Sequence, residues 1–406
     1  MTYNDYQMTF IMSMISNFAP QQKDVTDPVS AAQAIQTNFA KELPKIIAAA
    51  DFPVDVTVAW GPYVVVEAKD INKKHVATAT NTMLVFKYPS QTVAGANEYV
   101  VSVAGTKTTS VFDQMDEDLL GGKIADWPYS SKPNTIKISH GTLKGIGLLL
   151  GLNSGNSITD YFSTLNDPNA IITVAGHSLG GALSPALALI LFGAHTSFSK
   201  IPAQATSQNW TTRTYALAGP DVGNSDYVDY LHTTFPPQAV APAVKWQQFN
   251  CKIWNSLDIV PQVWSKGFKP YIDTIYGDQL DTPAAVKDIL TLLNTTLLSL
   301  NGLVNPYTCS DPDRLGQFAG TFQTALPKNG PMIKDDCSDS TCSSTPNSLA
   351  ACNFVGQILY QHINAYFEEI GVIDFLNAVT AGLDPTSVCN IKQKLLGQIG
   401  IEETVQ

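Results

Sequence analysis

The sequence predicts an α/β protein, a three-layer sandwich in which helices cover both faces of a mostly parallel central sheet. From Gly105 onward, wholly apolar strand-like stretches alternate with helical ones, which is typical of parallel strands buried on both faces. Before Gly105, stretches rich in β-branched and aromatic residues are bounded by Gly, Pro, Asp or Asn. With 406 residues, 44% of them hydrophobic, the chain has ample material for a large core.

The first hundred residues are predicted to form N-terminal helices and an antiparallel edge of the sheet. Helical apolar spacing runs over residues 31–50 and is expected to be interrupted by Pro44. Strands are expected over residues 54–60, 63–67, 76–86 and 99–104.

The central part of the chain supplies the parallel strands and the helices between them. A short strand over 136–138 is followed by a helix from about Leu143, and an apolar strand over 170–175 by a helix over 179–191. Further strands are expected over 212–218 and 244–254.

The last third is harder to assign. Residues 284–303 are amphipathic and predict a helix, residues 305–348 are dense in Pro, Ser, Asp and Cys, and helical spacing resumes from Leu349 to about Ile370. We interpret residues 265–348 as an insertion folded onto a single domain that spans residues 1–406.

The net charge of the chain limits the classes of partner that it can bind. A formal net charge of −11 and a pI near 4.9 disfavour nucleic acid, because phosphate contacts need clustered Lys and Arg. Anionic lipid surfaces are disfavoured too, whereas a neutral oil would not be repelled. No stretch approaches the roughly 18–20 apolar residues of a membrane span.

The cysteines indicate an oxidising compartment. Five of the six lie in the last third, at Cys309, Cys337, Cys342, Cys352 and Cys389. Two of them lie in the polar stretch DDCSDSTCSS, where disulfide partners are expected rather than buried thiols. No cysteine or histidine cluster has the spacing of a zinc site. Secretion is therefore predicted, although the N-terminus has no clear signal peptide and an intracellular location stays open.

The strongest local signal is the stretch IITVAGHSLGGA, which contains G-x-S-x-G between an apolar strand and a helix. Such a turn lifts the oxygen of Ser178 above the sheet and makes it a candidate nucleophile. The N–H of Leu179, at the start of the helix, points to where an oxyanion would form. His177 should point away from the serine and serve packing or hydrogen bonding.

A nucleophilic serine needs a histidine base and a carboxylate to orient it, and after such an elbow the acid precedes the base in the chain. His362 is the best base by order, ahead of His195 and His232. Asp258 follows a strand and precedes Pro261, which places it at the carboxyl edge of the sheet. Asp221, after an earlier strand, is its rival.

Several ordered segments resemble the class 3 lipases, the fungal-type triacylglycerol lipases of the α/β-hydrolase fold. The segment V-A-G-T ending at Thr106 is similar to the family's F-R-G-T/S oxyanion segment. S-H-G, with His140, is similar to its H-x-G-F region, and GHSLGG is its usual elbow. GPDVGN resembles G-x-P-R-V-G-N, D-I-V-P resembles the D-x-V-P acid loop, and His362 with Tyr366 resembles the terminal histidine segment.

The resemblance implies Ser178 as nucleophile, Asp258 as acid and His362 as base, and it removes Asp221, whose position holds arginine in the family. It also implies an oxyanion hole from Thr106 and the Leu179 N–H. Two departures stand out: Ala104 and Asp221 replace family arginines, which leaves the support of the oxyanion loop and the buried ion pairs open.

The resemblance further implies a lid helix between the oxyanion residue and Gly141. Residues 108–120 fit this prediction, because their apolar side chains are spaced as on one helix face. The side chains expected to cover the site or contact substrate are Val111, Phe112, Met115, Leu119 and His140. The alternative is a surface helix that stays packed.

We therefore predict an ester hydrolase that forms an acyl-enzyme, with neutral acylglycerols at a lipid–water interface as substrates and no metal or organic cofactor. A phospholipase, a feruloyl-type esterase and an acyltransferase share the same chemistry and stay open. A non-catalytic binding protein is the alternative from a different class. The sequence leaves the oligomeric state undetermined.

Overall fold

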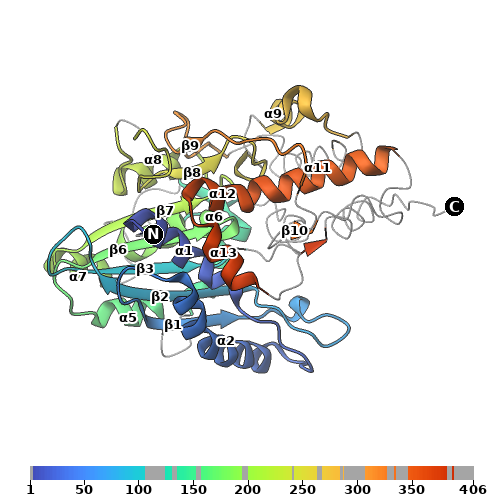
Figure 1. Ribbon diagram of the computed structural model, residues 1–406. Helices are drawn as coiled ribbons and strands as arrows, with labels where there is room; N and C mark the ends of the chain where they lie inside the picture. The colour runs from blue at the N-terminus through green and yellow to red at the C-terminus, as the bar shows by residue number, and fades with distance from the viewer. Residues whose placement is uncertain are drawn as a thin grey trace.

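A computed structural model (Figure 1) describes the chain over the following residues: 3–105, 124–129, 135–151, 157–193, 200–239, 242–262, 268–283, 287, 307–326, 333–334, 346–381 and 386–387. All structural statements below refer to these residues.

A seven-stranded sheet forms the middle of the molecule (Figure 1), in the order β1-β2-β3-β6-β7-β8-β9. Strand β2 is antiparallel to both of its neighbours, β1 and β3, whereas β3, β6, β7, β8 and β9 run parallel to one another. Their bounds are β1 Thr57–Val65, β2 Asn81–Pro89, β3 Asn97–Val103, β6 Ile171–His177, β7 Thr211–Leu217, β8 Lys252–Asn255 and β9 Gln317–Phe318. The predicted antiparallel edge and the mostly parallel centre are both confirmed.

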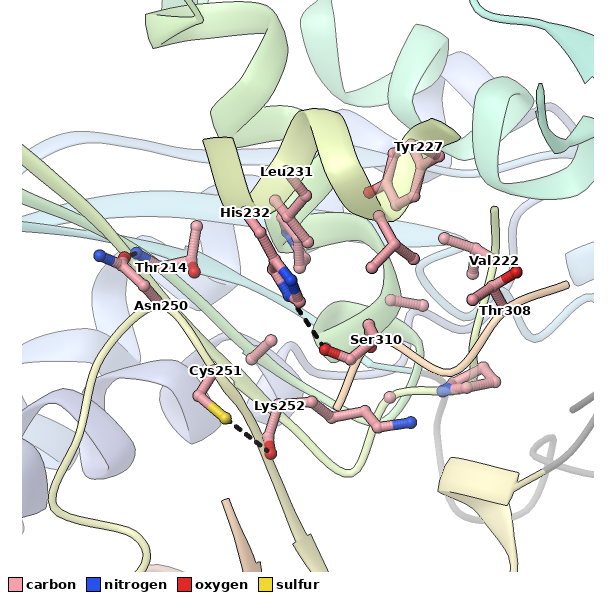
Figure 2. A pocket seen from close by; sticks show the side chains of 17 residues that line it. Thr214, Val222, Tyr227, Leu231, His232, Asn250, Cys251, Lys252, Thr308 and Ser310 are labelled. Atoms are coloured by element: carbon pink, nitrogen blue, oxygen red, sulfur yellow. Dashed lines mark hydrogen bonds between the residues drawn. The ribbon is translucent and has the colours of Figure 1, made fainter. Parts of the chain in front are cut away.

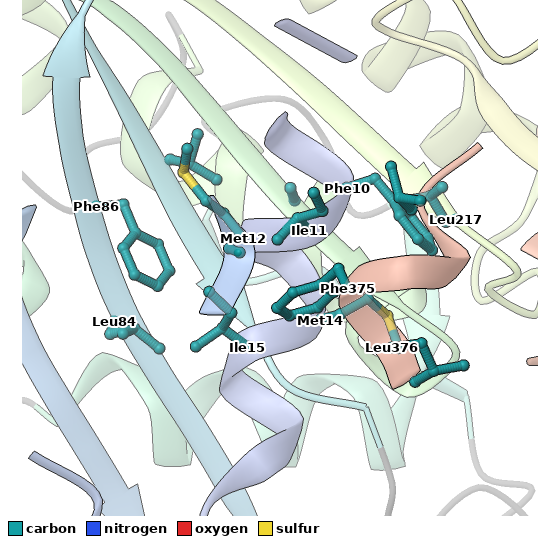
Figure 3. Close-up of a cluster of buried hydrophobic side chains, with 14 of the residues drawn as sticks. Phe10, Ile11, Met12, Met14, Ile15, Leu84, Phe86, Leu217, Phe375 and Leu376 are labelled. Atoms are coloured by element: carbon teal, nitrogen blue, oxygen red, sulfur yellow. The ribbon is translucent and has the colours of Figure 1, made fainter. Parts of the chain in front are cut away.

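One face of the sheet packs against helices from both ends of the chain. These are α1 (Asp5–Ile15), α2 (Pro28–Ala50), α12 (Asn364–Ile370) and α13 (Ile373–Thr380). Figure 3 shows Leu84 and Phe86 of β2 close to Ile15 of α1, with Phe375 of α13 on the other side of this helix. The 3₁₀ turn η1 (Ser16–Phe18) continues α1.

The opposite face is covered by α4 (His140–Leu150), α5 (Ile158–Thr164), α6 (Leu179–Phe192), α7 (Ile201–Ser207) and α8 (Ser225–Thr234). On β2, Met83 and Val85 belong to this second core, while Leu84 and Phe86 belong to the first. This alternation is the period-two pattern of a strand buried on both sides. The three-layer α/β-hydrolase-like sandwich is therefore confirmed.

Short elements complete the described chain. Two two-stranded sheets lie apart from the main sheet, one of β4 (Ile124–Asp126) with β5 (Lys137–Ser139) and one of β10 (Ile333–Lys334) with β11 (Thr386–Ser387). The remaining elements are η2 (Ala68–Asp70), η4 (Val260–Gln262), α9 (Phe268–Thr274), η5 (Gly277–Gln279) and α11 (Pro346–His362).

Several predicted elements differ in detail. The short strand expected over 136–138 is β5, which pairs antiparallel with β4 outside the main sheet. Helix α2 runs through Pro44 without a break, because this proline lies on the exposed side while Phe39 and Leu43 pack into the core. The strands expected over 54–60 and 63–67 are one strand, β1, whose register shifts beside Gly61. The strand expected over 244–254 is only β8, because the residues before it form turns around buried Trp246.

The predicted insertion, residues 265–348, is described only in part. Its residues Gln317–Phe318 extend the sheet as β9 beside β8. The helix expected over 284–303 lies outside the described residues except for Lys287, and the single-domain assignment stays a prediction. Within the described part of the chain, no helix is long and apolar enough to cross a membrane.

The disulfides expected for the two cysteines of the polar stretch stay a prediction. Among the described cysteines, Cys251 and Cys309 are free thiols. Cys337, Cys342 and Cys389, and the side chain of Cys352, lie outside what the structure describes. Secretion, which was inferred from these cysteines, stays a prediction.

Candidate active site

The elbow is a sharp turn between β6 and α6. Strand β6 ends at His177 and α6 begins at Leu179, so Ser178 alone makes the turn, with φ 60° and ψ −124°. This is a strained conformation for a residue with a side chain. A Cβ atom on Gly176 would lie 2.4 Å from the backbone of Gly180, so only glycine allows strand and helix to approach this closely.

Ser178, His362 and Asp258 form a continuous chain of hydrogen bonds. The Ser178 Oγ lies 2.8 Å from His362 Nε2, and His362 Nδ1 lies 2.9 Å from Asp258 Oδ2. Because an ionised carboxylate only accepts, Nδ1 carries the proton and Nε2 is free to accept from the serine hydroxyl. All three residues are buried, with exposed fractions of 6%, 2% and 0% respectively.

The carboxylate of Asp258 has further donors that fix its position. The N–H of Val260 donates to Oδ1 at 3.0 Å, and the hydroxyl of Tyr366 donates to Oδ2 at 2.9 Å. Burial, and next to it the charge of Asp258, raises the pKa of Tyr366 well above its usual value of 10, so the hydroxyl keeps its proton. Tyr366 in turn accepts from the N–H of Asn255, the last residue of β8, at 3.0 Å.

The position of His362 depends on the end of α11. The helix ends at His362, and α12 begins at Asn364, so the continuous helix expected up to Ile370 is broken at Ile363. The Asn255 side-chain amide donates to the backbone oxygen of Gln361 at 3.0 Å and to its Oε1 at 2.7 Å. Strand β8 therefore holds both the acid loop and the end of the helix that carries the base.

The ring of His177 lies next to the ring of His362. The His177 ring is buried, 4.8 Å from the His362 ring and 5.2 Å from the Tyr366 ring between centroids. Burial, and then the neighbouring His362, lowers the pKa of His177 well below its usual value of 6.5. The neutral ring thus packs against His362, in keeping with the packing role predicted for it.

The oxyanion hole and the lid are described only in part. Leu179 is the first residue of α6, and its N–H has no hydrogen-bond acceptor among the described residues. Thr106 and the predicted lid side chains Val111, Phe112, Met115 and Leu119 lie outside the described residues. His140 is exposed at the start of α4 and makes no hydrogen bond to the triad.

The alternative base and acid are in a different environment. His232 Nε2 lies 3.1 Å from the Ser310 backbone oxygen and lines a cavity of about 30 Å³ between α6, β7 and α8 (Figure 2). Such a volume holds about two water molecules. Asp221 binds Lys252 instead of a histidine. The third candidate base, His195, lies outside the described residues.

The described residues contain no group of three or more His, Cys, Asp or Glu side chains that could hold a metal ion. The hydrogen bonds of Ser178, His362 and Asp258 have the geometry that a serine nucleophile, a base and an orienting acid require.

Residues 100–268 match the family described as lipase (class 3). This match covers the elbow and less than half of the chain. The chain is a serine ester hydrolase, and its fold and elbow agree with the resemblance noted in the sequence. A search of curated proteins finds no match.

Solved structures of lipases match this chain, and the first of those named here shares its fold. The M37 lipase is 23% identical, with a TM-score of 0.67, and the match covers 98% of this chain and 100% of that one. The Rhizomucor miehei triacylglyceride lipase is 15% identical, with a TM-score of 0.36, over 66% of this chain and 78% of that one. Lipase II from Rhizopus niveus is 14% identical, with a TM-score of 0.37, over 65% and 76%.

Two residues close to the candidate site were not assigned roles from the sequence. Tyr366 was noted only as part of the terminal segment, although its hydroxyl reaches the acid. Asn17 was not noted at all, yet its side chain hydrogen-bonds the oxyanion segment at Gly105. The four-residue spacing from His362 to Tyr366 could have indicated the first; no local pattern marks the second.

Proposed function

We propose that this protein is a class 3 lipase that hydrolyses the ester bonds of neutral acylglycerols through a Ser178–His362–Asp258 triad and an acyl-enzyme. The observation that carries the proposal is the unbroken hydrogen-bond chain from Asp258 Oδ2 through both nitrogens of His362 to Ser178 Oγ. Each atom in this chain has the donor or acceptor role that acyl transfer requires.

In the first step, Ser178 Oγ attacks the ester carbonyl while His362 Nε2 takes its proton. The negative charge that develops on the carbonyl oxygen would be met by the N–H of Leu179 and by Thr106. Each such donor typically contributes about 10²–10³ in rate. Asp258 stabilises the imidazolium that forms and holds its ring in place.

In the second step, the tetrahedral intermediate collapses and His362 gives its proton to the leaving alcohol. A water molecule, deprotonated by the same nitrogen, then attacks the acyl-enzyme and releases the fatty acid. The enzyme returns to its starting protonation state, with neutral His362 between the serine and the carboxylate.

The substrate class rests on the family and on charge. Class 3 lipases act on lipid esters, and a net charge of −11 disfavours anionic surfaces while leaving neutral oil droplets accessible. We therefore expect the enzyme to act at the surface of emulsified triacylglycerol.

The experiment compares wild type with Ser178→Ala on short and long p-nitrophenyl esters and on emulsified triacylglycerol. The substitution should lower kcat on the order of 10⁶-fold. Ser184→Ala is a matched control, because Ser184 is also buried in α6 and its hydroxyl has no hydrogen-bond partner in the described structure. It should keep wild-type activity.

The outcomes separate the alternatives. Activity on long-chain emulsions that is lost only in Ser178→Ala supports the proposal. Activity confined to short soluble esters, to phospholipids or to feruloyl esters would replace the acylglycerol assignment with that class. A folded wild type inactive on every ester, or equal activity in Ser178→Ala, would overturn the proposed catalytic role.

A further inference from the structure

We infer that Asn17, outside every segment that resembles the family, is a positioning residue for the oxyanion loop. The inference rests on the proposed function, because it assigns Asn17 a role in stabilising the oxyanion of that reaction. Asn17 Oδ1 accepts a hydrogen bond from the N–H of Gly105 at 2.7 Å. Gly105 directly precedes Thr106, the predicted oxyanion donor.

The orientation of the Asn17 amide is set by its other end. Its Nδ2 donates to the backbone oxygens of Met14 at 3.2 Å and Ser13 at 3.4 Å, in the last turn of α1. Because these acceptors need the amide nitrogen, the oxygen is the atom that faces Gly105. Helix α1 therefore presents a fixed acceptor to the loop.

Helix α1 is itself firmly held, so the acceptor has a rigid base. Nine of its residues are buried, and it packs on β3 and β6. The hydroxyl of Ser102 in β3 donates to the Met12 backbone oxygen at 2.7 Å, and the ring of Phe10 lies 4.9 Å from that of Phe367. An amide on such a base is a precise support, because its position follows that of the sheet.

The loop needs this support because of what surrounds Gly105. A Cβ on Gly105 would lie 2.5 Å from the His177 backbone oxygen and 3.2 Å from the Ser178 Cβ, so the loop touches the elbow here. Asn17 fixes the peptide on the amino side of Gly105. Only the glycine's own two dihedral angles then decide where the next peptide, which carries the Thr106 N–H, points.

The hydrogen bond between Asn17 and Gly105 lies next to the position at which the family has an arginine. Buried Ala104 stands at that position, and its own N–H donates to the Thr82 backbone oxygen at 2.9 Å. The side-chain support of the segment comes instead from Asn17, which is 88 positions away in the chain. In this chain an uncharged amide therefore holds the loop at Gly105.

The experiment measures kcat/KM for a soluble ester and for its thiono analogue, in which sulfur replaces the carbonyl oxygen. Sulfur is larger and a weaker acceptor, so the thiono ester gains little from the oxyanion donors. The ratio of kcat/KM for the ester to kcat/KM for the thiono ester therefore measures how much the oxyanion donors contribute to the rate. It does not depend on the fraction of enzyme that is folded, because both rates come from one preparation.

Asn17→Ala should reduce this ratio about 10- to 100-fold, with KM for the soluble ester nearly unchanged, because a misplaced donor is lost mainly in the transition state. The matched control is Ser102→Ala, which also removes a buried hydrogen bond at α1 but does not touch Gly105. The control should lose stability and keep the wild-type ratio.

An unchanged ratio in Asn17→Ala, whatever its total activity, would overturn the inference and leave Asn17 with a structural role. An equal fall of the ratio in Ser102→Ala would overturn it as well, since any loosening of α1 would then suffice. Failure of the proposed function looks different: Ser178→Ala, run in the same assay, would hydrolyse the ordinary ester as fast as wild type.

Discussion

Asp221 and Asp258 are two buried carboxylates on loops that follow adjacent parallel strands, β7 and β8, yet their surroundings lead to different roles. Asp221 Oδ1 accepts from Lys252 Nζ at 2.8 Å and from the backbone N–H and hydroxyl of Ser310, both at 3.0 Å. Asp258 accepts from His362, Tyr366 and the Val260 N–H.

The two carboxylates differ in what their hydrogen-bonding partners, Lys252 and His362, contact next. Lys252 Nζ also donates to the backbone oxygen of Pro261 at 3.1 Å, so this chain of contacts ends in the main chain. Burial alone would lower the pKa of Lys252, but Asp221 raises it above its usual value, and the ammonium keeps its proton. His362 instead presents its second nitrogen to Ser178. A carboxylate is placed for catalysis when its partner can pass a proton on.

The two pairs are also connected. Pro261 is the last residue of the acid loop that begins at Asp258. Because Lys252 donates to its backbone oxygen, the Asp221–Lys252 pair also holds the acid loop in place. Where the family has an arginine at position 221, this chain has a carboxylate whose positive partner lies on β8. The sign of the charge at this position is therefore the reverse of the family's, and in this chain Lys252 balances it.

The largest expected effect tests which carboxylate belongs to the triad. Asp258→Asn should lower kcat about 10⁴-fold, because an amide would hold His362 in the wrong tautomer. Asp221→Asn, the matched control, should change kcat less than about tenfold. Steady-state kinetics on a soluble ester distinguishes the two. Equal losses in both variants would remove the distinction drawn above.

Next in size is the stability of the structural pair. Lys252→Met leaves the Asp221 charge buried without its cation, and the free energy of unfolding should fall by about 3–5 kcal/mol in urea titrations. Adding Asp221→Asn to this variant should recover most of the loss, because no buried charge then remains unpaired. If the double variant is no more stable than Lys252→Met, the pair is not what stabilises this region.

A smaller effect is expected at the hydroxyl that supports the acid. Tyr366→Phe removes the donor to Asp258, and kcat should fall about tenfold, as expected for one hydrogen bond to a charged group. Tyr276→Phe is its control, because the Tyr276 hydroxyl is buried nearby without a hydrogen-bond partner in the described structure. A similar loss in both variants would assign the effect to packing.

The smallest effect concerns pH and His177. Since burial lowers the pKa of His177 well below 6.5, only the unfolded chain takes up this proton as the pH falls below 6.5. Between pH 7 and 5.5 this should lower the free energy of unfolding by about 1 kcal/mol. In His177→Gln the free energy of unfolding should fall by about 1 kcal/mol less than in wild type over the same pH interval. Urea unfolding at both pH values measures this difference. Parallel losses in the two proteins would contradict a neutral buried His177.

The sequence predicted the parts of the site that depend on local patterns. An apolar strand, a glycine turn and a helix lie within one short stretch around Ser178, and the acid loop follows directly after a strand. The order of acid and base along the chain then separated Asp258 from Asp221 and His362 from His232. Their placement in one hydrogen-bonded group agrees with this order, while their catalytic roles await the kinetics described above.

The remaining features depend on contacts between distant segments. Asn17 meets Gly105 only because α1 packs on the strand that leads to this glycine, and no pattern around residue 17 indicates such a partner. Likewise, Pro44 was expected to break α2, but the packing of Phe39 and Leu43 holds the helix together. In these places tertiary packing outweighs the local signal.

Helix α1 has a consequence for the order in which the molecule is assembled. Its buried side lies against strands β3 and β6 and against the ring of Phe367. Figure 3 shows Phe375 beside it as well. At ordinary rates of translation, those aromatic partners leave the ribosome on the order of tens of seconds after α1 does. His362 emerges equally late. The apolar helix is therefore without these partners during that interval, and hydrolytic activity through His362 can arise only after the segment that carries His362 has been synthesised.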